Sequence, residues 1–86
     1  MNKYLLIRNN KAKVKVVFDY LSVNELTNPN DKQKAMLSGI CDGVEVIEED
    51  REQRAKEKMK PGDWLYRIIG EEKELVRIVN HKTDKP

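Results

Sequence analysis

The amino-acid sequence predicts a small single domain of the α+β class, in which an N-terminal and a C-terminal β-hairpin form one antiparallel sheet with one or two short helices between them. Apolar and charged residues alternate near the N-terminus, a glycine divides an apolar stretch near the C-terminus, and helix-capping residues lie between. A chain of 86 residues buries one small core and has no room for a second domain. We expect residues 1–80 to form the domain and residues 81–86 to be a disordered polar tail.

The N-terminal hairpin is predicted from an alternating pattern. Lysine and apolar residues alternate from Lys11 to Tyr20, as in a strand with one face in water. Met1–Arg8 contains a short apolar run, and Asn9-Asn10 separates the two segments. Because asparagine tolerates the positive φ of a two-residue turn, the two segments are expected to pair as a hairpin.

Capping residues predict short helices in the middle of the chain. Ser22-Val23-Asn24-Glu25 has the spacing of a capping box, in which serine and glutamate side chains satisfy free backbone N–H groups. Asp31 is placed to cap a helix over residues 32–38, with Gly39 as its stop.

The segment around residues 35–47 has a second interpretation. Residues 35–40 could instead form a strand that pairs with residues 44–47, because Asp42-Gly43 is a strong hairpin signal. We slightly prefer the helix. Residues 44–47 are a short strand on either interpretation.

A charged helix is predicted over Glu48–Met59, since this segment contains good helix formers and is acidic at its start and basic at its end. Ile47, Ala55 and Met59 form only a narrow apolar stripe, so most of the helix should face water or a partner. Proline at position 61 then ends it.

The C-terminal hairpin is predicted from the densest apolar content of the chain. Trp64–Ile69 and Glu74–Asn80 read as strands, and residues 70–73 between them contain a glycine suited to a turn.

Charge and cysteine content restrict the classes of function. Seventeen basic and fifteen acidic residues give a net charge of +2, which is small for a nonspecific polyanion binder. Residues 1–40 carry the basic excess and residues 41–86 the acidic one. Cys41 is the only cysteine, so no internal disulfide can form and a reducing cytoplasm is the expected compartment. The N-terminal apolar run is too short for a membrane span, and no membrane partner is expected.

One candidate site is the basic face of the predicted N-terminal hairpin. On that face lysines would follow phosphates and an aromatic ring would stack on an unpaired base of DNA or RNA. The plainer explanation is that lysines protect an edge strand from pairing with other chains. The residues are Tyr4, Arg8, Lys11, Lys13 and Lys15.

A second candidate site would bind a protein partner. Glu49, Asp50 and Arg54 lie on the predicted charged helix, and Trp64, Tyr66 and Arg77 form an aromatic and basic set on the C-terminal hairpin. A single tryptophan in a small domain is, however, more often a core residue than a binding platform.

Catalytic and cofactor motifs are absent from the sequence. Cys41 and His81 are the only candidates for a nucleophile and a base, and a buried thiol beside a surface histidine explains them better. No metal-ligand spacing or phosphate-binding loop occurs, so neither metal nor cofactor is expected.

These observations favour a non-enzymatic cytoplasmic accessory protein that binds a larger protein, as an inhibitor or adaptor of the compact kind that bacteriophages and mobile elements encode. The alternative is a nucleic-acid-binding module. The small core also makes association with a second copy an expected property.

Overall fold

The structure, a computed structural model, describes residues 1–12 and 15–80 and confirms an α+β domain with one antiparallel sheet. The tail predicted over residues 81–86 lies outside the described residues. The elements are β1 (Asn2–Arg8), α1 (Lys15–Tyr20), α2 (Val23–Thr27), α3 (Asp31–Ile40), β2 (Gly43–Glu49), α4 (Glu52–Glu57), β3 (Trp64–Ile69) and β4 (Glu72–Ile78).

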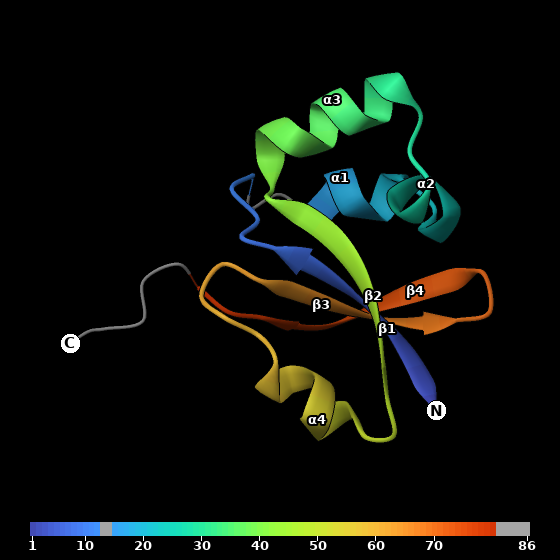
Figure 1. The fold of residues 1–86 in the computed structure, drawn as a ribbon, viewed down its shortest axis with the longest axis vertical. Coiled ribbons are helices and arrows are strands. Elements are labelled where there is room, and N and C mark those ends of the chain that lie inside the picture. The colour runs from blue at the N-terminus through green and yellow to red at the C-terminus, as the bar shows by residue number, and fades with distance from the viewer. Residues whose placement is uncertain (13–14, 81–86) are drawn as a thin grey trace.

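The sheet lies between two helical layers (Figure 1). Its strand order is β2-β1-β3-β4, with α1, α2 and α3 over one face and α4 over the other. β1 occupies a central position because its residues Tyr4, Leu5, Leu6 and Ile7 are all bulky and all buried, which requires cover on both faces of the strand.

Two hydrophobic clusters hold these layers together. Under α1, α2 and α3, alternate residues of β1 and β3 pack against Phe18 and Leu26, and the rings of Phe18 and Trp64 lie 5.8 Å apart. On the opposite face Tyr4, Leu6, Ile47 and Leu65 pack with Ala55 of α4, and Met59 is partly buried beside them. Of the apolar stripe predicted for the charged helix, only Ala55 lies on α4; Ile47 belongs to β2 and Met59 follows the helix, although all three are in or beside this cluster.

The prediction of an N-terminal hairpin is wrong for its second strand. Residues 15–20 form α1, and Lys13 and Val14 lie outside the described residues. Phe18 and Leu21, one helical turn apart, are both buried, whereas Val16 is 67% exposed. β1 pairs instead with β2 and β3, both antiparallel. Asn9 does adopt the positive φ predicted for a turn, at 47°.

Helices form at both predicted places, but only the first has the predicted cap. The Ser22–Glu25 capping box is present at the start of α2. α3 begins at Asp31 as a helix, although Asn30 rather than Asp31 is its cap, and the strand alternative for residues 35–40 is wrong. Gly39 does not stop this helix, which continues to Ile40.

The later elements differ from prediction mainly in their lengths. β2 runs on to Glu49, so the charged helix is limited to residues 52–57. The C-terminal hairpin is confirmed, and its turn is tighter than predicted because Gly70 takes a φ of 64°.

Gly39 and Gly70 offer a matched pair of stability predictions. A methyl group at Gly39 meets no atom within 4 Å, and its φ is not positive, so Gly39→Ala should raise the free energy of unfolding by about 0.5 kcal/mol. Gly70→Ala should lower it by about 1 kcal/mol, because alanine is strained at positive φ. Urea denaturation measures both, and equal effects of the two substitutions would contradict this assignment.

Candidate functional site

Among the described residues, those predicted for the basic face of the N-terminal hairpin do not form one exposed surface. Tyr4 is buried on the α4 side of the sheet, with 1% of its surface exposed, so its ring cannot stack on a base. Lys11 Nζ lies 3.3 Å from an Asp42 carboxylate oxygen, and Lys15 Nζ lies 2.7 Å from Asp19. Lys13 lies outside the described residues.

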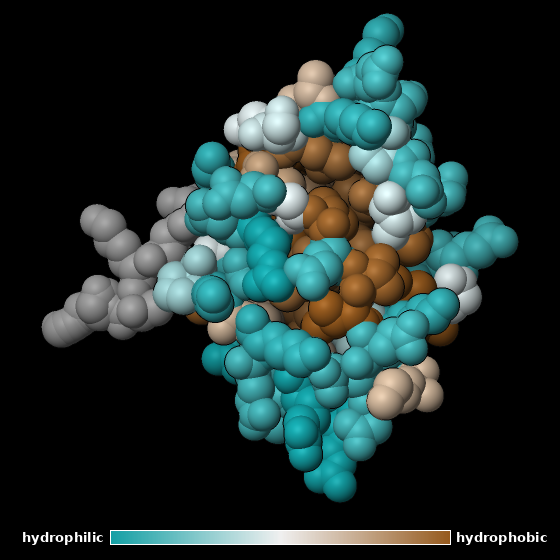
Figure 2. Space-filling model, viewed as in Figure 1, coloured by the Kyte–Doolittle hydropathy of each residue, from teal (hydrophilic) through white to brown (hydrophobic). Residues whose placement is uncertain are grey.

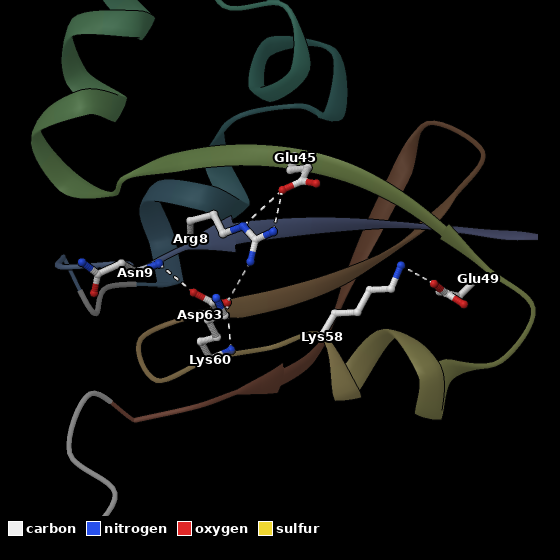
Figure 3. A network of polar contacts seen from close by, with 7 residues as sticks. All are labelled: Arg8, Asn9, Glu45, Glu49, Lys58, Lys60 and Asp63. Atoms are coloured by element: carbon white, nitrogen blue, oxygen red, sulfur yellow. Dashed lines mark hydrogen bonds and ion pairs between the residues drawn. The ribbon is translucent and has the colours of Figure 1, made fainter.

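Arg8, the remaining member of that set, belongs to a polar network at the end of β1 (Figure 3). Its guanidinium donates to Glu45 at 2.7 Å and lies 3.6 Å from the buried carboxylate of Asp63. Asp63 also accepts hydrogen bonds from the backbone N–H groups of Asn9 and Lys60, at 2.9 and 3.0 Å. The network joins the end of β1 to the loop before β3, and Arg8 takes part in that connection.

Two of the predicted partner-binding residues lie in the core. Trp64 and Tyr66 are 4% and 1% exposed and pack under α1, which corrects their assignment to a binding surface. Four members of the set stay near the surface, and of these Glu49 is engaged with Lys58 (Figure 3). Asp50, Arg54 and Arg77 are exposed, and their role in partner binding stays a prediction.

The hydroxyl of Tyr66 is buried and has no hydrogen-bond partner among the described residues. Because a buried polar group without a partner costs free energy, Tyr66→Phe should leave the free energy of unfolding unchanged or raise it by up to about 1 kcal/mol. Denaturation in urea at neutral pH measures this difference. A loss above about 1 kcal/mol would mean that the hydroxyl is bonded in solution.

The same substitution should change the alkaline limit of stability. Burial, and secondarily the charge of Asp19, raises the pKa of Tyr66 above its ordinary value of about 10. The folded protein then holds a proton that the unfolded chain has released, so stability is lost as pH rises above about 10. Tyr66→Phe should reduce this alkaline loss, which urea denaturation at stepped pH values measures.

An apolar groove lies between α1 and α3, at a place that the sequence did not indicate. Its volume is about 550 Å³. Three of its apolar side chains are well exposed: Val16 at 67%, Tyr20 at 86% and Met36 at 41%. We name it the α1–α3 groove, and its main lining residues are Val16, Val17, Tyr20, Leu21, Lys32 and Met36.

Linked helix caps tie α3 to α2 beside the groove. Glu25 accepts a hydrogen bond from the backbone N–H of Ser22, and Gln33 from that of Asn30. Gln33 Nε2 also donates to the other carboxylate oxygen of Glu25 at 2.9 Å, which ties α3 to α2. The hydrogen bonds from Ser22, with a further one from Gln33, lower the pKa of Glu25. Both Glu25 oxygens are thus engaged within the protein.

The one cysteine is poorly placed for chemistry. Cys41 is 2% exposed, and its Sγ lies 3.4 Å from the carbonyl oxygen of Leu37. Burial raises the pKa of its thiol, which lowers the fraction of reactive thiolate. His81 lies outside the described residues.

Within residues 1–12 and 15–80, no group of three or more acidic, histidine or cysteine side chains is arranged to hold a metal ion. In the same part of the chain, no helix has the length and apolar content to cross a membrane. Comparison with protein families, with curated proteins and with solved structures finds no match to this chain.

Proposed function

We propose that this protein is a non-enzymatic cytoplasmic accessory protein that binds a larger protein through the α1–α3 groove. The observation that carries the proposal is the clustering of Val16, Tyr20 and Met36, which are exposed although a hydrophobic cluster lies directly beneath their helices. Large apolar side chains gathered in a concave surface are typical of a place where a partner docks.

The groove best fits an amphipathic helix of the partner that carries an acidic residue beside its apolar face. Two helices form its walls, and a third helix can pack its apolar residues between them. Lys32 at the rim has no ion-pair partner within the described residues, whereas both Glu25 oxygens are engaged. The charge available to a ligand is therefore positive, and an acid on the partner would pair with it.

Cys41 supports the non-enzymatic and cytoplasmic parts of the proposal. A buried thiol with a raised pKa is a weak nucleophile, and a lone unpaired cysteine suits a reducing compartment. Inhibition or adaptation of the partner, and an origin in a bacteriophage or mobile element, remain predictions from size and composition.

A pull-down that compares matched variants tests the proposal. Tagged wild-type protein, Met36→Lys and the control Ile69→Lys are incubated with nuclease-treated lysate. Ile69 is 52% exposed and does not line the groove, so its replacement introduces the same charge elsewhere. We expect Met36→Lys to reduce capture of the partner about 10-fold or more, because a lysine would be desolvated in an apolar contact. Equal capture by both variants contradicts the proposal.

A cross-link then identifies the partner segment. A photoreactive phenylalanine analogue in place of Tyr20 should cross-link to a helical segment with apolar residues at i and i+4 and an acid beside them. Charge reversal of that acid should weaken binding, and Lys32→Glu in this protein should restore it. Cross-links to loops or to nucleic acid would overturn the choice of ligand.

A further inference from the structure

The sheet has two edge strands, and they differ in how well they are protected. β2 and β4 lie at the two ends of the strand order. β4 contains Lys73 and Arg77, and its pairing with β3 shifts register near Tyr66. β2 pairs with β1 over seven residues without a shift and contains neither lysine nor proline. Lysines and bulges are the devices that keep an edge from pairing with another chain, so β2 is the more open edge.

A hollow of about 250 Å³ lies beside β2, on the side of the sheet covered by α2 and α3, and its lining is apolar apart from Thr27, Lys34, Ser38 and Asp42. Val44 lines it, and Val46, two residues further along the same face, is 42% exposed. Figure 2 shows this apolar surface between α3 and β2, surrounded by hydrophilic residues. The side chains that complete its apolar lining are Leu26, Pro29, Leu37 and Cys41.

The charge along β2 selects the ligand. Residues 42–50 contain five acids and no lysine or arginine. Glu48 and Asp50 have no ion-pair partner within residues 1–12 and 15–80. Two copies paired through β2 would bring acids of the same sign together, which disfavours self-association at this edge.

We propose that the free edge of β2 binds an extended basic segment of a partner protein as a fifth strand of the sheet. Backbone hydrogen bonds along the edge would supply affinity, and alternate side chains would supply specificity. On the helix side the segment places apolar residues against Val44 and Val46 and in the hollow. On the α4 side its lysines or arginines lie beside Glu45 and Glu49, which alternate with those valines along the strand. Each of these carboxylates already pairs with one cation of the protein, Arg8 or Lys58, and has acceptor positions left for a second.

This inference rests on the proposed function only in assuming that the ligand is a protein. The β2 edge is built from different residues than the α1–α3 groove, so two segments could bind at once. An accessory protein with a helix-binding groove and a strand-binding edge can hold two segments at the same time, as an adaptor does.

A synthetic peptide tests the proposal without knowledge of the partner. The probe is an acetylated, amidated nine-residue peptide of alternating lysine and valine, and the control peptide has glutamate at each lysine position. We expect the lysine peptide to bind at least about 10-fold more tightly and to lose affinity with salt. Amide NMR shifts should change mainly in β2, with new protection from hydrogen exchange along its outer edge. Shifts that concentrate in β4, or no binding of either peptide, would overturn the proposal.

Two protein variants provide the matched comparison. Val46→Lys places a positive charge on the β2 edge, and Ile78→Lys does the same on the β4 edge; both native side chains are 42% exposed. Only Val46→Lys should lower the affinity for the lysine peptide, by about 10-fold or more. Thermal denaturation checks that both variants are folded. Equal peptide affinity for the two variants contradicts the proposal. Concentration-dependent dimerisation that Val46→Lys abolishes and the peptide does not displace would instead make a second copy the ligand.

The groove variant separates this inference from the proposed function. Met36→Lys should bind the lysine peptide with wild-type affinity, because Met36 lines the groove and not the hollow. If the lysine peptide does not bind but Met36→Lys still reduces capture of the partner, the β2 site is contradicted and the groove is not. If the lysine peptide binds but Met36→Lys and Ile69→Lys capture the partner equally, the groove is contradicted and the β2 site is not.

Discussion

Replacing Phe18 with alanine is expected to lower the free energy of unfolding by about 3 to 5 kcal/mol. Phe18 is fully buried and is the one buried residue of α1. Its ring packs against Trp64 with centroids 5.8 Å apart. Because α1 has only six residues, it has little helical stability of its own and depends on this contact. Urea denaturation followed by tryptophan fluorescence measures the loss.

Two control substitutions make the Phe18 result specific. Phe18→Leu keeps most of the buried volume, so it should lower the free energy of unfolding clearly less than Phe18→Ala does. Val16→Ala, on the exposed side of α1, should change stability by less than about 0.5 kcal/mol. If Phe18→Ala cost no more than Val16→Ala, α1 would not be docked on the sheet as described.

The segment from Lys11 to Tyr20 shows why one element of the fold was mispredicted. Its alternating lysines satisfy the period of a strand, but Val17, Phe18 and Leu21 also satisfy the spacing of a helix. Short segments that fit both periods are decided by tertiary contacts, here the Phe18 contact with Trp64. One feature of the sequence argued against the hairpin. Residues 4–7 are four consecutive bulky residues, and all four are buried. They need cover on both faces of the strand, which a two-stranded hairpin with one face in water does not supply.

Elements with local signals were predicted well. The Ser22–Glu25 box and the C-terminal hairpin depend on residues close in sequence, and both are present. The α1–α3 groove depends on two helices separated by α2, so no local pattern could indicate it. Val16 and Tyr20 were predicted to lie in a strand. Because residues 15–20 are helical, these two side chains, four residues apart, lie on the same face of α1.

The second large effect is expected for Asp63→Ala, which should lower the free energy of unfolding by about 2 to 4 kcal/mol. Asp63 is 2% exposed and accepts hydrogen bonds from two backbone N–H groups, those of Asn9 and Lys60. Alanine would remove the side-chain acceptor of both and one anionic neighbour of Arg8. Urea denaturation measures the loss.

A comparison with Glu45→Ala shows whether the Asp63 effect comes from the backbone or from the ion pair. Glu45 also pairs with Arg8, at 2.7 Å, but its side chain is 51% exposed. Exposed ion pairs contribute less than about 1 kcal/mol, so Glu45→Ala should be mild. Asp63→Asn removes the charge and keeps one acceptor oxygen, and it should fall between the two. If Asp63→Ala were as mild as Glu45→Ala, the backbone N–H groups would have other acceptors. The loop before β3 would then be held to the end of β1 by the backbone contact between Asn10 and Gly62 rather than by the Asp63 carboxylate.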